Sequence, residues 1–295
     1  MQLSSDSRLE RKKAMSLRKL PELNAGARGR IQSFVSPSAM SRWTPGIQAA
    51  AGDSPDNTIS ILDVIGEDWW TGEGVTSNRI AGALRAIGER DVVVNVNSPG
   101  GDMFEGVAIY NQLRMHPGRV TVNILGMAAS AASVIAMAGD EIRIGRPSFL
   151  MIHNCWCLAA GNRHDFAALS EQMAPFDAAM ADVYQERTGV DLKRITSLMD
   201  KESWIGGSVA VADGWADALL EDSAIKQGSD TQASAVRRIE AALRASGMPR
   251  SEAQRVLSEF KSGLSDSAGN GGLSDSAAKP VAAASLQNLL NAMKG

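Results

Sequence analysis

Two serine hydroxyls stand among small residues in the run Gly126-Met-Ala-Ala-Ser-Ala-Ala-Ser-Val-Ile-Ala-Met-Ala-Gly139. The apolar residues at 120–124 predict a strand that arrives at Gly126, and we expect a helix of small residues after it. The unpaired N–H groups at a helix start favour negative charge. A serine there, Ser130, can attack a carbonyl while nearby amides hold the oxyanion. The alternative is that Ser130 only caps a buried helix packed through alanines.

A serine nucleophile needs a base, and the chain has three histidines. His116 stands where a helix breaks at a proline, which is typical of a solvated helix end. His164 lies in a polar loop or a first helical turn, where we expect it to be exposed. His153 ends the apolar stretch Phe149–Ile152, at a strand–loop junction of the kind where catalytic residues of α/β folds collect. His153 is therefore the candidate base, and a purely structural role is the alternative.

Strand and helix patterns alternate between about residues 58 and 222. This alternation indicates an α/β domain with parallel strand pairing. The glycines of Asn97-Ser-Pro-Gly-Gly101 predict a turn between one such strand and its helix. The predicted strands are 59–65, 91–96, 120–124, 141–144, 148–153 and 218–220. The predicted helices are 78–87, 104–115, a helix that follows Gly126 and ends at 138, 164–187, 191–199 and a short helix within 203–217. Pro175 is a candidate kink in the helix at 164–187.

Composition describes an ordinary globular protein of 295 residues with a formal net charge of −3 and 44% hydrophobic residues. That balance does not indicate a nucleic-acid partner, and no apolar segment is long enough to cross a bilayer. The basic N-terminus lacks the apolar region of a signal peptide. Cys155 and Cys157 are the two cysteines, and their spacing favours a reducing compartment over a disulfide or metal site. We predict a cytoplasmic protein without a cofactor or metal.

The flanking regions differ in composition from this α/β core. Residues 1–57 are polar and turn-rich, which predicts a mobile leader or propeptide. The catalytic domain is predicted at 58–222, and a small helical segment follows at 223–261. Residues 262–295 are expected to form a flexible linker, rich in Gly, Ser and Asp, and a terminal amphipathic helix at 285–293.

Three motifs together resemble the proteolytic subunit of the Clp protease, the ClpP family. They are Asn97-Ser-Pro-Gly-Gly101, Gly126-Met-Ala-Ala-Ser130 and Met151-Ile-His153, in the family's order and approximate spacing. The resemblance implies a ClpP/crotonase-like spiral of ββα units with a long protruding helix.

The same resemblance implies roles for individual residues. It makes Ser130 the nucleophile and His153 the general base, with the amides of Gly101 and Ala131 forming the oxyanion hole. Ser133 is a rival nucleophile, but it lies deeper in the predicted helix, away from the unpaired amides.

The third member of the triad departs from the family pattern. The family's aspartate falls on Glu202, counting without gaps from Thr188-Gly189 to Ala216-Asp217. A glutamate can accept the imidazole N–H, and Ser-His-Glu triads are a known variant. Asp200 is the alternative acid if the loop shifts, and a Ser–His dyad is the third possibility.

The Glu-Ser-Trp sequence at 202–204 and the long terminal extensions look like the Clp-like proteases of tailed phages and prophages. Those enzymes are thought to mature procapsids by cutting scaffold or capsid protein and their own ends. The resemblance also implies a ring-shaped homo-oligomer that meets a second ring through the helix at 164–187. No phosphate-binding glycine motif is present, so any ATP-driven unfolding would come from a separate ATPase.

Two other functions compete with an ATP-independent serine endopeptidase. The first is a crotonase-type acyl-CoA hydratase or isomerase, whose related fold also uses paired amides but does not require a serine–histidine pair. The second is a catalytically inactive ring or scaffold assembly protein, which the irregular acid and the long tail would suit.

Overall fold

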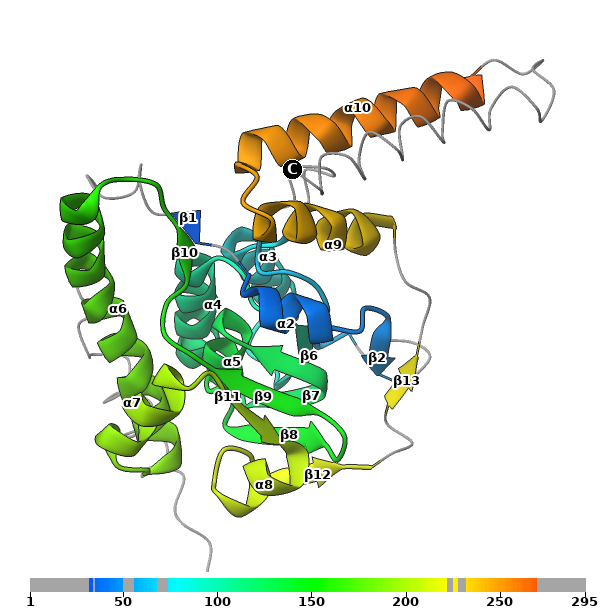
Figure 1. Ribbon diagram of the computed structural model, residues 1–295. Coiled ribbons are helices and arrows are strands. Elements are labelled where there is room, and N and C mark those ends of the chain that lie inside the picture. The colour runs from blue at the N-terminus through cyan, green and yellow to red at the C-terminus, as the bar shows by residue number, and fades with distance from the viewer. Residues whose placement is uncertain are drawn as a thin grey trace, which may run out of the picture. The chain divides into compact units, whose positions relative to one another are not determined.

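A mostly parallel sheet lies at the centre of the first of two units in the computed structural model (Figure 1). The structure describes residues 32–33, 35–49, 56–67, 74–221, 225–227 and 232–269. The units span residues 1–230 and 231–295. Over the described residues, the sheet has seven strands: β3 (Thr58–Ile61), β6 (Val92–Ser98), β7 (Val120–Ala129), β8 (Glu141–Gly145), β9 (Phe149–Ile152), β11 (Ser203–Gly206) and β12 (Ala218–Leu220).

The strand order along the main path is β11-β9-β7-β6-β3, with β8 beside β7 and β12 beside β8. Every pair is parallel except β11 with β9. Alternate residues point to one face, as the two-residue period of a strand requires. That face forms the core, and its side chains are at most 4% exposed in Ile59, Ile61, Val92, Val94, Val96, Val120, Val122, Ile124, Ile142 and Ile144.

Helices pack against this core through their apolar positions. In α3 (Ser77–Ile87) the buried residues are Ile80 and Ile87, and in α4 (Met103–Met115) they include Ile109 and Leu113. Both helices confirm the predicted boundaries to within one residue. The other helices of the first unit that are described are α2 (Pro37–Arg42), α5 (Ala131–Ala136), α6 (Arg163–Thr188), α7 (Leu192–Asp200) and α8 (Gly207–Ala212).

Helix α6 is the long helix that the sequence predicts, and it extends away from the sheet (Figure 1). It runs without a break through Pro175. Asn162 caps its start by accepting from the amides of His164 and Asp165, and Gly189 ends it in the left-handed conformation, at φ 70°.

Strand β7 changes partner along its length. Its residues 121–124 pair with β8, whereas its residues 127–129 pair with β9. The register against β6 shifts between Val96 and Ser98, where the change occurs. The prediction that a helix follows Gly126 is therefore wrong, because the backbone of 127–129 is engaged in the sheet. Helix α5 begins only at Ala131.

The segment 35–49 is not the mobile leader that the sequence predicts. It forms α2 and β2 (Ile47–Ala49), and Trp43 is only 3% exposed. The indole N–H of Trp43 donates to the carbonyl of Asn97 over 3.1 Å, and the Asn97 amide donates to the carbonyl of Thr44 over 3.0 Å. β2 also pairs antiparallel with β13 (Ile225–Gln227). Residues 1–31 of the predicted leader lie outside the described residues.

Two further short strand pairs and some single bridges lie among the described residues of the first unit. β1 (Gln32–Ser33) pairs with β10 (Cys157–Leu158), and β4 (Gly66–Glu67) pairs with β5 (Gly74–Val75), both antiparallel. The predicted strand at 59–65 ends earlier than expected, at Ile61, and Ile65 makes only isolated bridges to Val75 and Gly101.

The second unit contains two helices among its described residues, α9 (Gln232–Ala245) and α10 (Arg250–Gly269). The unit boundary lies at 230/231 rather than at the predicted 222/223, because β13 pairs with β2 of the first unit. Residues 262–269, predicted as linker, continue α10. The rest of the linker and the predicted helix at 285–293 lie outside the described residues.

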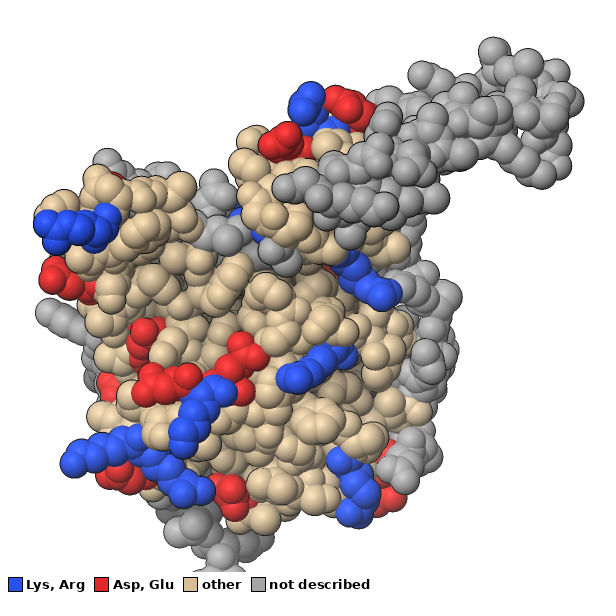
Figure 2. Space-filling model, viewed as in Figure 1, with Lys and Arg blue, Asp and Glu red and all other residues tan. Residues whose placement is uncertain are grey.

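Acidic and basic side chains are interspersed on the face of the molecule seen in Figure 2. Of the helices that the structure describes, none is both long enough and apolar enough to span a membrane.

The docked segment makes a stability prediction. Trp43→Ala should lower the free energy of unfolding by roughly 3–5 kcal/mol, because it removes a buried aromatic side chain and leaves a cavity. It should also speed tryptic cleavage after the neighbouring Arg42. Denaturant unfolding and timed digestion measure the two effects.

The control for Trp43→Ala is Met115→Ala, which removes a large apolar side chain that is 73% exposed. That variant should change stability by less than about 0.5 kcal/mol. Equal stability of both variants would show that segment 35–49 is not held against the sheet.

Candidate active site

Ser130 lies at a sharp turn between β7 and α5. Its φ of 54° is in the left-handed region, which is unusual for a residue other than glycine. Its N–H donates to the carbonyl of Met151 over 2.9 Å, and its own carbonyl accepts from the amides of Ser133 and Val134. A strained strand-to-helix turn of this kind projects a serine side chain out of the backbone. The turn therefore fixes the direction in which the Ser130 side chain leaves the backbone.

His153 follows β9 and meets Ser130. Its Nε2 lies 2.6 Å from Ser130 Oγ, so the hydroxyl donates to the ring in the tautomer that carries its proton on Nδ1. The two residues meet because β7 and β9 are adjacent and parallel, with Ala129 opposite Met151. The carboxyl ends of neighbouring parallel strands lie at the same edge of a sheet. The sequence-predicted nucleophile and base are thus brought together.

Burial sets the protonation of His153. The side chain is enclosed, with the residue only 6% exposed. This burial lowers the pKa of His153 below its ordinary value, and the negative charge of Glu202 opposes the shift. A neutral imidazole at neutral pH is the form that can accept a proton.

The turn after β6 packs against Ser130. Gly100 has a φ of 88°, and a Cβ on it would lie 2.7 Å from the Cβ of Ser130. Gly101 has a φ of 150°, and a Cβ there would lie 2.1 Å from the carbonyl oxygen of Ile65. The Ile65 N–H donates to the carbonyl of Gly100 over 2.8 Å, and the Asp102 N–H donates to the carbonyl of Ile65 over 2.9 Å. Only glycine fits this turn, and the hydrogen bonds fix it.

Two main-chain amides are available near the serine. Ala131 opens α5, so its N–H belongs to the first turn, where no intrahelical acceptor exists. Gly101, Ser130 and Ala131 line one pocket together. An oxyanion hole formed by the amides of Gly101 and Ala131 stays a prediction, with both residues beside the serine.

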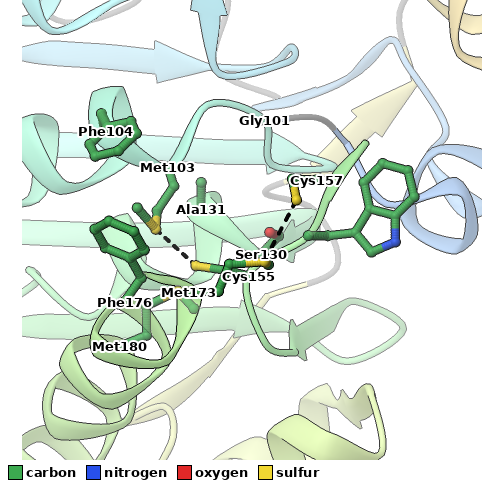
Figure 3. A pocket seen from close by; sticks show the side chains of 11 residues that line it. Gly101, Met103, Phe104, Ser130, Ala131, Cys155, Cys157, Met173, Phe176 and Met180 are labelled. Atoms are coloured by element: carbon green, nitrogen blue, oxygen red, sulfur yellow. Dashed lines mark hydrogen bonds between the residues drawn. The ribbon is translucent and has the colours of Figure 1, made fainter. Parts of the chain in front are cut away.

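The pocket beside Ser130 is lined by apolar and sulfur-bearing side chains (Figure 3). Phe104 of α4 and Phe176 of α6 meet edge to face, with centroids 5.7 Å apart. Cys155 Sγ lies 3.0 Å from the sulfur of Met103. The remaining side chains of the lining are Trp156, Cys157, Met173 and Met180. The lining is therefore mainly apolar.

Glu202 lies near His153 but does not hydrogen-bond to it. The distance from Glu202 Oε2 to His153 Nδ1 is 3.9 Å, beyond hydrogen-bond range. The carboxylate instead accepts from Ser36 Oγ over 3.3 Å and from Ser38 Oγ. The direct bond that the sequence leads us to expect is therefore absent, although the carboxylate lies close enough for its charge to act on the ring.

The alternative acid, Asp200, is engaged elsewhere: the side-chain amide of Asn154 donates to its Oδ1 over 2.9 Å. Of the two candidate acids, Glu202 is the one whose negative charge raises the pKa of His153. The assignment of Glu202 as the acid of the triad stays a prediction.

The remaining sequence candidates lie apart from this pair. Ser133 is fully buried, and its Oγ is 2.6 Å from the carbonyl of Ser130 and 2.8 Å from the hydroxyl of Tyr184. His164 is exposed at the start of α6, as predicted. His116 is not solvated as we expected; it is 6% exposed and its Nε2 lies 2.7 Å from the carbonyl of Arg90.

Sequence reasoning missed Ser36 and Ser38 entirely. They lie 164 or more residues from Glu202 in the chain, in a stretch without periodicity. No local signal connects them to the site. The pocket-lining residues of α6 had one signal, the helical spacing of Met173, Phe176 and Met180.

This fold and this serine–histidine pair are typical of α/β proteins that hydrolyse acyl bonds through a serine. A family model described as Clp protease matches residues 76–223, half of the chain, and the chain belongs to that family. Family membership makes the protein a peptidase by descent. It does not by itself assign the catalytic residues.

Several curated proteins are similar to this chain. The ATP-dependent Clp protease proteolytic subunit of Deinococcus radiodurans is 26% identical over 144 residues, covering 48% of this chain and 71% of that protein. Subunit 2 of Corynebacterium diphtheriae is 29% identical over 136 residues, covering 45% and 68%. Subunit 1 of Corynebacterium jeikeium is 30% identical over 133 residues, covering 44% and 71%.

The environment of His153 predicts the pH dependence. Because burial lowers its pKa, the acid limb of kcat/KM should lie below pH of about 6.5, the ordinary value for histidine. Glu202→Gln should move that limb to still lower pH, since it removes the charge that favours the imidazolium. Its rate should fall roughly 10-fold, short of the ~10⁴-fold cost of losing a directly bonded acid.

Asp200→Asn is the matched control for Glu202→Gln, because it removes the same charge from the neighbouring turn. Its acid limb should stay with that of the wild type. If Asp200→Asn shifts the limb and Glu202→Gln does not, the acid is Asp200.

Proposed function

We propose that this protein is a serine endopeptidase that uses Ser130 as nucleophile, His153 as general base and Glu202 as the third member. The observation that carries the proposal is the 2.6 Å contact between Ser130 Oγ and His153 Nε2. Membership of the Clp protease family supports it independently.

The residues divide the reaction as follows. Ser130 Oγ attacks the scissile carbonyl while His153 Nε2 takes its proton, and the amides of Gly101 and Ala131 donate to the oxyanion that forms. His153 then gives the proton to the leaving amine, which leaves an acyl-enzyme. Water attacks this ester with His153 again as base, and Ser130 is regenerated. The charge of Glu202, 3.9 Å from Nδ1, favours the imidazolium in both steps.

The pocket beside Ser130 supports a preference for substrates with an apolar side chain next to the scissile bond. Its methionine, cysteine and aromatic lining suits an apolar side chain next to the scissile bond. Methionines adapt to different shapes, so several apolar side chains should be accepted. By membership of the Clp protease family, the substrate would be a protein or peptide.

For the biological role, we infer a procapsid maturation protease of a phage or prophage, acting in the host cytoplasm. Its substrates would be scaffold or capsid protein and its own termini. The Glu-Ser-Trp sequence at 202–204 and the long terminal segments support this assignment. By the family resemblance, the protein would work as a ring-shaped homo-oligomer. Peptide cleavage itself would not need ATP, and a separate ATPase would be required only for folded substrates.

The family match does not favour the two competing functions. A crotonase-type acyl-CoA enzyme would not require the Ser130–His153 contact, and an inactive scaffold protein would have no use for it.

The central test is Ser130→Ala. We expect complete loss of labelling by a fluorophosphonate and of self-cleavage, because both need the Ser130 oxygen. Labelling is measured by intact mass, which also locates any cut in the terminal segments.

Ser133→Ala is the matched control, and it should retain labelling although it is expected to be roughly 1–3 kcal/mol less stable, because the Tyr184 hydroxyl loses a buried partner. Labelling that persists in Ser130→Ala and disappears in Ser133→Ala would assign the nucleophile to Ser133. Portal and capsid genes beside this gene would support the phage role, and their absence would count against it.

A further inference from the structure

Two hydroxyls hold the carboxylate of Glu202. Ser36 Oγ donates to Oε2 over 3.3 Å, Ser38 Oγ donates to Oε1, and the two hydroxyls lie 2.8 Å from each other. Ser36 is 2% exposed. Both come from the start of α2, far from Glu202 in the chain. The two hydroxyls have two protons for these three contacts, so when Ser38 donates to Oε1 the Ser36 proton goes either to Oε2 or to Ser38 Oγ.

The segment that carries these serines is fixed to both sides of the site. Trp43 and Thr44 hydrogen-bond to Asn97, which leads into the Gly100-Gly101 turn. The Arg42 guanidinium stacks over the ring of Trp204, 4.6 Å from its centroid, two residues after Glu202. The segment from Ser36 to Thr44 therefore contacts the end of β6, just before the Gly100-Gly101 turn, and also contacts Trp204, just after the acid.

Glu202 needs such support. Its φ of 48° is in the left-handed region, and its side chain remains 34% exposed. A glutamate side chain with this much access to water would otherwise spread over several rotamers. The hydroxyl pair of Ser36 and Ser38 selects one of them, in which Oε2 lies 3.9 Å from His153 Nδ1.

We propose that Ser36 and Ser38 are positioning residues of the catalytic site, which hold the Glu202 carboxylate opposite His153. This inference rests on the proposed serine peptidase function. It extends the Ser-His-Glu triad into a network that includes the N-terminal segment.

Other charged groups near this network are already engaged. Asp200 accepts from Asn154, and Asp177 of α6 accepts from the amide of Cys155 over 2.6 Å. Arg42 lies over Trp204. The charge of Glu202 raises the pKa of His153. A movement of the Glu202 carboxylate should therefore change the pKa of His153.

The network also limits self-processing. A cut in the leader after Ser38 would remove both donors from the chain. N-terminal cleavage that preserves full activity must therefore fall before Ser36, and not near residue 58 where the sequence alone would place the end of the leader.

The experiment measures the second-order rate of fluorophosphonate labelling against pH. Ser36→Ala/Ser38→Ala should lower the rate at pH 7 by roughly 3- to 10-fold, the equivalent of one net hydrogen bond. Its acid limb should move to lower pH, in the direction of Glu202→Gln, because the released carboxylate turns towards water. Ser38→Thr keeps a hydroxyl and should restore the wild-type profile.

Two comparisons separate positioning from a structural effect. Ser41→Ala removes an exposed hydroxyl of the same helix that donates to the carbonyl of Ser38, and it should change neither rate nor profile. In the Glu202→Gln background, the two serine substitutions should have no further effect on the profile. If the double variant does not fold, single Ser38→Ala takes its place in the same series.

Three results would overturn the inference. They are an acid limb that stays with the wild type, a limb that moves to higher pH because the serines hold the carboxylate away from His153, and a loss of rate that remains in the Glu202→Gln background. A wild-type protein that is not labelled at all would instead overturn the proposed function, and the inference with it.

Discussion

The pairing of β7 with two different partners is the constraint on which the site depends. Its first half pairs with β8 and its last residues pair with β9. This change brings the end of β7 beside the end of β9, so that Ser130 and His153 come within 2.6 Å. If the last residues of β7 paired with β8 instead of β9, Ser130 would not lie beside His153. The glycine at 126 suits this path, because a Cβ on Gly126 would lie 2.8 Å from the side chain of Asn97.

Burial and charge act on His153 in opposite directions. Enclosure lowers the pKa of its imidazole, whereas the carboxylate of Glu202 raises it. The result is an imidazole with a lowered pKa and a negative charge nearby, which is what the proposed general base needs. Because Glu202 is partly exposed and 3.9 Å away, this stabilisation is weaker than that of a directly bonded acid. In the proposed network, Ser36 and Ser38 of segment 35–49 restrict the Glu202 side chain to one rotamer.

The elements with strong local patterns were predictable. The β-branched runs of β6 and β8, the helical spacing of α3 and α4, and the extent of α6 all agree with the sequence prediction. The errors share one physical cause. Residues 127–129 pair in a sheet although alanines favour helix, and residues 35–49 are ordered by contacts with Asn97 and β13. In both cases partners distant in the chain outweigh local preference.

By itself the sequence determined the nucleophile and base candidates, the glycine turn and the α/β class, because each leaves a local signature of residue type and spacing. The tertiary structure alone decided what surrounds the acid. Ser36 and Ser38 contact Glu202 across more than half of the chain, and nothing in either stretch specifies the other. A hydrogen bond between distant residues depends on how the intervening chain folds, and only the folded chain reveals it.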